Sequence, residues 1–131
     1  MMKLKNTWLK FFSLSIGGLY IAFIFYICLT PTPPQTEIEI PFLDKIAHFL
    51  MYFGLIIWFG QIFCTKWMRW WFISFFSMGV LVENLQKLGG VRSFEYEDMI
   101  SNAIGLTLGL FIVKSPLGEL LSKFEDSITH D

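Results

Sequence analysis

The feature that most constrains this chain is an unbroken apolar run from Phe11 to Leu29. About 20 apolar residues, each adding a rise of about 1.5 Å to a helix, cross the hydrocarbon core of a bilayer. A basic N-terminal segment precedes the run, which makes a secretory signal peptide the alternative. The exit from Cys28 to Pro31 lacks the small residues of a cleavage site, however. The pattern therefore predicts a retained membrane span over residues 8–29.

Three more apolar segments follow, and their ends carry signals that stop helices. The sequence Thr30-Pro31-Thr32-Pro33-Pro34 terminates the first span and opens a short acidic loop with Glu37, Glu39 and Pro41. Gly89-Gly90 gives the third span a C-terminal stop. Hydrophobic residues make up 54% of the 131 residues, more than is usual in soluble domains. We expect one all-α domain over residues 1–131, a polytopic membrane four-helix bundle with spans at about 8–29, 45–64, 69–88 and 97–113 and a cytoplasmic tail over 114–131.

The basic residues are divided unequally between the two predicted sides. With the N-terminus inside, the outer segments hold only Lys45, Lys87 and Arg92, whereas the inner segments hold Lys3, Lys5, Lys10, Lys66, Arg69, Lys114 and Lys123. The positive-inside rule therefore predicts that both termini are cytoplasmic. At the inner end we expect no polar set, and we expect the tail to form a short helix around residues 117–124 without chemistry of its own.

This topology brings polar residues from three separate segments to the outer face. They occur at the start of the second span, at the end of the third, and in the loop and first turns of the fourth. Charged and amide side chains within a bilayer are costly, so we expect these to be paired, hydrated or functional. The predicted ligand-binding set is Asp44, Lys45, His48, Glu83, Gln86, Arg92, Asp98 and Asn102.

Glu83 and His48 are the first candidates for chemistry in this set. Glu83 lies about 10 Å inside the end of its span, judged from the rise of a helix. It is either a ligand-binding or proton-exchanging carboxylate, or a structural tie to Arg92, Lys45 or a backbone donor. His48 is either a general base or an interhelical hydrogen-bond partner of Glu83 or Asn102. The sequence leaves both choices open.

Asp44 and Arg92 also have two interpretations each. Asp44 lies at the start of the second span, where it is either a helix cap or a catalytic group. The guanidinium fork of Arg92 suits a phosphate or carboxylate group of a ligand, and the alternative is an ion pair with Glu95 or Asp98.

The fourth span carries a seam of small residues. Gly105 and Gly109 are spaced to lie on one helical face, which lets a neighbouring helix approach closely. Asn102 shares that face and is expected mainly to hydrogen-bond across the same seam.

Charge and motif content argue against several classes of function. A formal net charge of −1 gives no indication of a nucleic-acid partner. His48, Glu83 and Asp98 are permissible metal ligands, but their spacing is not that of a metal motif, so no metal is predicted. The sequence has no Gly-rich phosphate loop, G-x-S-x-G or C-x-x-C motif, and we therefore expect no cofactor.

Taken in order, these motifs resemble the VanZ-like family of membrane proteins, named for an accessory factor in resistance to the glycopeptide teicoplanin. A Gly-Arg pair that the family pattern includes is replaced here by Gly90-Val91-Arg92. The resemblance implies a small protein of the bacterial cytoplasmic (inner) membrane. A glycopeptide-resistance-like role has no support besides the resemblance, and family likeness alone does not transfer it. The motifs that carry the resemblance are Asp44-Lys45-Ile46-Ala47-His48-Phe49 with Tyr52, Glu83-Asn84-Leu85-Gln86, and Arg92 followed by Asp98, Asn102, Gly105 and Gly109.

Three functional hypotheses use the same residues. The favoured one is a binding module in the lipid bilayer, whose outer polar site holds a lipid-linked cell-envelope precursor or an anionic lipid. The second is a structural or interaction subunit of a homo- or hetero-oligomer, in which the polar residues only join the helices. The third is an enzyme acting on a lipid head group, with His48 as base and Glu83 or Asp98 as acid.

Overall fold

The computed structural model describes residues 1–31 and 42–129 of the chain, and the elements it contains there are all helices. The all-α prediction is therefore confirmed for these residues. Most of the predicted acidic loop, including Glu37, Glu39 and Pro41, lies outside the described residues.

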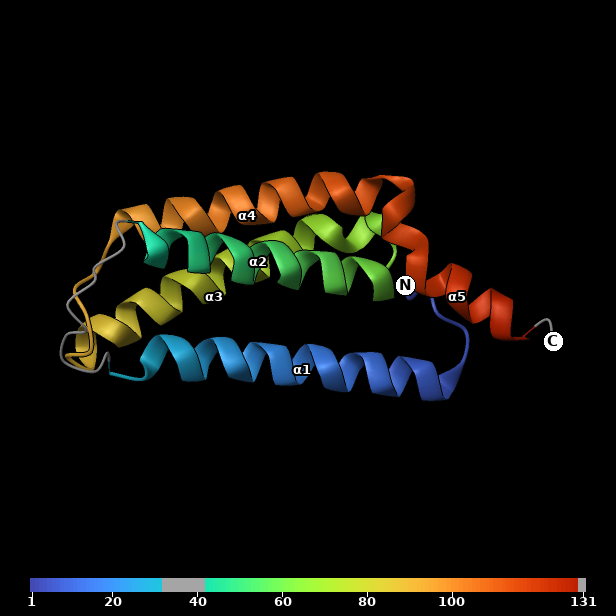
Figure 1. Ribbon diagram of the computed structural model, residues 1–131, viewed down its shortest axis with the longest axis horizontal. Coiled ribbons are helices and arrows are strands. Elements are labelled where there is room, and N and C mark those ends of the chain that lie inside the picture. Colours follow the sequence, from blue (N-terminus) through green and yellow to red (C-terminus); the bar gives the residue numbers. More distant parts are fainter. Residues whose placement is uncertain (32–41, 130–131) are drawn as a thin grey trace.

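Four long helices lie side by side and alternate in direction, as Figure 1 shows. Their bounds differ by at most two residues from the predicted spans, because apolar length and the flanking breakers set both. The connection between the second and third long helices contains the short 3₁₀ helix η1 (Thr65–Trp67). The long helices are α1 (Thr7–Leu29), α2 (Leu43–Ile62), α3 (Met68–Leu88) and α4 (Tyr96–Lys114).

Two of these helices, α1 and α2, are long and apolar enough to cross a membrane. A third span results if α4 is counted together with the helical segment Pro116–Thr129, from which it is bent by 74°. Helix α3 is of similar length but carries Glu83, Gln86 and Lys87 near its C-terminal end. Length and composition thus support two or three spans in the described part of the chain.

Large apolar side chains cover the outside of the bundle, and many polar ones lie inside it. On α1, Trp8 is 82% exposed and Leu19 is 71% exposed, and Phe111 on α4 is 66% exposed. A water-soluble domain has the opposite tendency. The buried polar or charged residues are Ser13, His48, Gln61, Glu83, Gln86, Asp98, Asn102 and Glu125.

Helices α2 and α4 approach most closely, along the predicted small-residue seam. A Cβ atom on Gly105 would lie 2.5 Å from the carbonyl oxygen of Phe49, and one on Gly109 would lie 3.0 Å from that of Phe53. Only glycine permits such an approach of two backbones. The first turns of α2 and α4, which carry most of the predicted site, are therefore held rigidly beside each other.

The opposite end of the bundle confirms a helical tail and corrects the expectation that no polar set lies there. The tail forms η2 (Pro116–Glu119) and α5 (Leu120–Thr129), and α5 is tied to the N-terminal segment. Glu125 is 2% exposed and accepts hydrogen bonds from the backbone N–H groups of Lys5 and Asn6. Lys3 Nζ donates to the carbonyl oxygens of Gly60 and Gly118 at 2.7 and 2.8 Å. A buried polar set therefore exists here, because these side chains satisfy backbone groups left over at helix ends.

Candidate functional site

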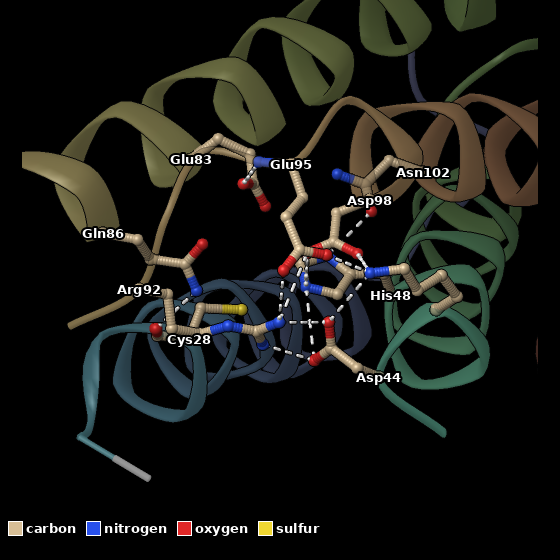
Figure 2. A network of polar contacts seen from close by, with 10 residues as sticks. Cys28, Asp44, His48, Glu83, Gln86, Arg92, Glu95, Asp98 and Asn102 are labelled. Atoms are coloured by element: carbon tan, nitrogen blue, oxygen red, sulfur yellow. Dashed lines mark hydrogen bonds and ion pairs between the residues drawn. The ribbon is translucent and has the colours of Figure 1, made fainter. Parts of the chain in front are cut away.

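Eight predicted site residues gather at the end of the bundle where α2 and α4 begin and α3 ends (Figure 2). Gly90, with a positive φ of 67°, lets the chain leave α3 and turn back toward α2. This turn brings Arg92 and Glu95 over the ends of the helices. Together with Glu95, the predicted residues form what we call the polar cluster: Asp44, Lys45, His48, Glu83, Gln86, Arg92, Glu95, Asp98 and Asn102.

Arg92 and Asp44 form a bidentate ion pair. The two terminal nitrogens of Arg92 donate to the two Asp44 oxygens at 2.5 and 2.6 Å. This bond raises the pKa of Arg92 above its ordinary value. One expectation is corrected, because Phe42 rather than Asp44 occupies the cap position of α2 and Asp44 makes no cap hydrogen bond among the described residues. The expected ion pairs of Arg92 with Glu95 and Asp98 are present at 3.6 and 3.8 Å, but its closest partner is Asp44.

Lys45, in the first turn of α2, contacts both the loop before α4 and the first turn of α4. Its ammonium group contacts the Glu95 carboxylate and lies 2.9 Å from Asp98 Oδ1. The hydrogen bond from Lys45 lowers the pKa of Glu95 below its ordinary value. From the sequence, Glu95 is predicted only as an ion-pair partner of Arg92. Glu95 contacts Lys45 only because the chain turns at Gly90, so the sequence around Glu95 does not predict that it belongs to the site.

His48 is buried, with its side chain 3% exposed, and its two ring nitrogens have different surroundings. Nδ1 hydrogen-bonds to Asn102 Oδ1 at 3.1 Å, which is one of the two partners considered from the sequence. Nε2 faces carboxylate oxygens, with Asp98 Oδ2 at 3.5 Å and Asp44 Oδ1 at 4.0 Å. Gly79 on α3 leaves the room that the Asn102 amide occupies, since a Cβ there would lie 2.8 Å from Asn102 Nδ2.

Glu83 is fully buried, and of the structural partners predicted for it the described part of the chain supplies the backbone donor and not a cation. Its Oε2 accepts a hydrogen bond of 3.3 Å from the backbone N–H of Glu95, and its Oε1 has no partner among the described residues. Neither Arg92 nor Lys45 forms an ion pair with it in that part of the chain. Gln86 is similar, because its Nε2 donates to the carbonyl oxygen of Cys28 at 2.7 Å while its buried Oε1 has no hydrogen-bond partner there.

The polar cluster contains more acidic than permanently basic side chains. The carboxylates of Asp44, Glu83, Glu95 and Asp98 face two permanent cations, Lys45 and Arg92. With all four carboxyl groups ionised and His48 neutral, the difference is two negative charges. Buried charges need compensation, so this set can take up protons, a cation or hydrogen-bond donors from a ligand.

A cavity of about 400 Å³ adjoins the polar cluster between α1 and α2. Its polar lining includes Asp44, His48 and Arg92, and its apolar lining includes Ile27 and Met51. A space with one polar and one apolar wall suits an amphiphilic molecule.

One part of the polar cluster also has the composition of a metal site. One ligand atom from each of Asp44, His48 and Asp98 lies within 4.8 Å of the others. The ligand set considered from the sequence contained Glu83 in place of Asp44. The pairing of the first turns of α2 and α4 brings Asp44 into this set.

No protein-family model, no curated protein and no solved structure matches this chain.

Proposed function

We propose that the chain is a VanZ-like integral protein of the bacterial cytoplasmic membrane, with α1 to α4 as four spans and both termini in the cytoplasm. The apolar outer faces of the helices support the membrane location, because exposed residues such as Trp8, Leu19 and Phe111 would contact water in a soluble protein. The excess of basic residues on the side of Lys3, Lys66 and Lys114 supports the orientation. The polar cluster then lies near the outer face.

Labelling of single cysteines tests this orientation. Cys28 and Cys64 are free and would first be replaced by alanine. Tyr96, beside the polar cluster, is 72% exposed, and the Lys5 side chain at the opposite end is 83% exposed. In intact cells a membrane-impermeant maleimide should label a cysteine at position 96 and spare one at position 5. The reverse pattern, or equal labelling, would refute the orientation.

We further propose that the protein binds the head group of a lipid-linked or anionic envelope component at the polar cluster. The observation that carries this proposal is the cavity that joins Ile27 and Met51 to Arg92 and His48. Acyl or prenyl chains would lie along α1 and α2, while the head group would reach the cluster. Because Arg92 and Lys45 are already paired with carboxylates, neither is free to bind a phosphate alone.

Photo-crosslinking within the membrane tests this binding site. A photoreactive residue at position 51, in the cavity, should capture a lipid with an envelope head group. The same residue at position 111, which is 66% exposed on α4, is the matched control and should capture bulk phospholipid. Identical lipid products at both positions would count against a specific site.

A further inference from the structure

We propose that Asp44, His48 and Asp98 bind a divalent transition-metal cation, with Asn102 positioning the histidine. The site depends only on these residues, so it does not rest on lipid binding. Two carboxylate oxygens and one imidazole nitrogen are a common ligand set for such ions, and a protein site of three ligands leaves positions for water or another ligand.

The spacing of the three ligand atoms is close to what a metal requires. Metal–ligand bonds of about 2.0–2.2 Å place neighbouring ligand atoms about 3.4 Å apart in a tetrahedral site. His48 Nε2 lies 3.5 Å from Asp98 Oδ2 and 4.0 Å from Asp44 Oδ1. One atom from each of the three residues lies within 4.8 Å of the others, so side-chain rotation has to shorten these separations by up to about 1.4 Å to bring all three atoms to one ion.

The orientation of His48 is the independent observation that points to a cation. In the tautomer that carries its proton on Nδ1, His48 donates to Asn102 Oδ1 at 3.1 Å. The lone pair of Nε2 then faces the two carboxylates. At 3.5 and 4.0 Å these contacts are longer than ordinary hydrogen bonds. A histidine that donates from one nitrogen to a neighbouring oxygen and presents the other to acidic groups has the arrangement of a metal ligand and its outer partner.

The charge of the polar cluster favours a doubly charged ion. Four carboxyl groups face two permanent cations, so with all four ionised and His48 neutral one divalent ion makes the set neutral. Arg92 and Lys45 already contact Asp44 and Asp98, and each carboxylate has further lone pairs for the metal. The nitrogen ligand favours Mn²⁺ or Zn²⁺ over Mg²⁺ or Ca²⁺.

The test is a binding titration on the full-length protein in detergent, after removal of metals with a chelator. Replacing Cys28 and Cys64 by alanine removes the free thiols, and replacing His130 by Gln leaves His48 as the single histidine. Mn²⁺ should bind at about one equivalent per chain, and electron spin-echo spectra should show coupling to a histidine nitrogen. Saturation without such coupling, or no binding by this protein, would overturn the proposal.

Matched variants assign the site. Asp98→Asn keeps the shape of a buried ligand and should weaken Mn²⁺ binding at least 30-fold. Glu97→Gln removes a neighbouring exposed carboxylate and should leave affinity unchanged. Asn102→Ala should weaken binding about 10–100-fold through the orientation of His48. If Asp98→Asn does not fold, Asp44→Asn provides the same test. Equal affinity in wild type and in a folded ligand variant would contradict the assignment.

Discussion

The two ends of the helix bundle both bury charged and amide side chains, but they use them differently. At the end near α5, Lys3, Gln61 and Glu125 bond to backbone groups, with Gln61 joining the carbonyl of Leu117 and the N–H of Leu121. At the other end, charged side chains bond mainly to one another, and buried oxygens of Glu83 and Gln86 have no hydrogen-bond partner among the described residues.

This difference separates a structural role from a binding role. Backbone groups at helix ends must be satisfied, so side chains that bond to them contribute to stability and leave little capacity for a ligand. A cluster with unequal charges and unpaired oxygens contributes less to stability and retains bonding capacity. We therefore expect substitutions at the two ends to have effects of different size, and removal of the Glu83 carboxylate to have the opposite sign to removal of the Glu125 carboxylate.

The largest effect is expected at Glu125. Replacing it by Gln removes a buried carboxylate that accepts hydrogen bonds from Lys5 and Asn6. Hydrogen bonds to charged groups contribute about 1.5–3 kcal/mol, so the free energy of unfolding should fall by about 2 kcal/mol. Thermal unfolding in detergent measures this, with the exposed neighbour Asp126→Asn as the control. A fall of equal size in the control would show that the effect is not specific to the buried carboxylate.

A smaller loss is expected for Arg92→Gln. It leaves Asp44 without its main partner, but the two side chains are 26% and 37% exposed, so solvent compensates for part of the loss. We expect the free energy of unfolding to fall by about 1 kcal/mol. Arg92→Lys should restore only part of this because lysine cannot form the two-pronged contact. Full recovery with lysine would show that charge alone matters. Lys87→Gln, at an exposed cation of the same end, is the control.

The smallest effect is the pH dependence of the Lys45–Glu95 pair. Lys45 lowers the pKa of Glu95 in the folded protein, so the unfolded chain binds a proton at a higher pH than the folded one. The contribution is complete above the unfolded pKa of about 4.3 and is lost as the pH falls through the lower folded pKa. The difference in melting temperature between wild type and Glu95→Gln should therefore shrink on acidification. A difference independent of pH would contradict this pairing.

The helices and the place of the polar cluster could be predicted because both follow from local signals. Apolar length sets α1 to α4, and Gly89-Gly90 marks the end of α3. Alternating helix directions then place Asp44 and Asp98 at the same end. These inferences need only the chain direction and the helix rise.

The individual contacts could not be predicted, because they depend on a turn and on packing between distant segments. The positive φ of Gly90 decides that Arg92 meets Asp44, and the same turn leaves Glu83 beside a backbone N–H without a cation. The attachment of α5 through Glu125 joins residues at the two ends of the sequence. No periodicity encodes such a contact.

The most direct test of the contrast between the two ends is the sign of the stability change in Glu83→Gln. The glutamine keeps an acceptor for the Glu95 N–H and removes one acidic group from a cluster in which four carboxyl groups face two permanent cations. Thermal unfolding in metal-free detergent at neutral pH should show a higher melting temperature than wild type, while Glu125→Gln shows a lower one. If Glu83→Gln lowers the melting temperature as Glu125→Gln does, the polar cluster has the same structural role as the buried polar residues at the opposite end, and the contrast between the two ends is contradicted.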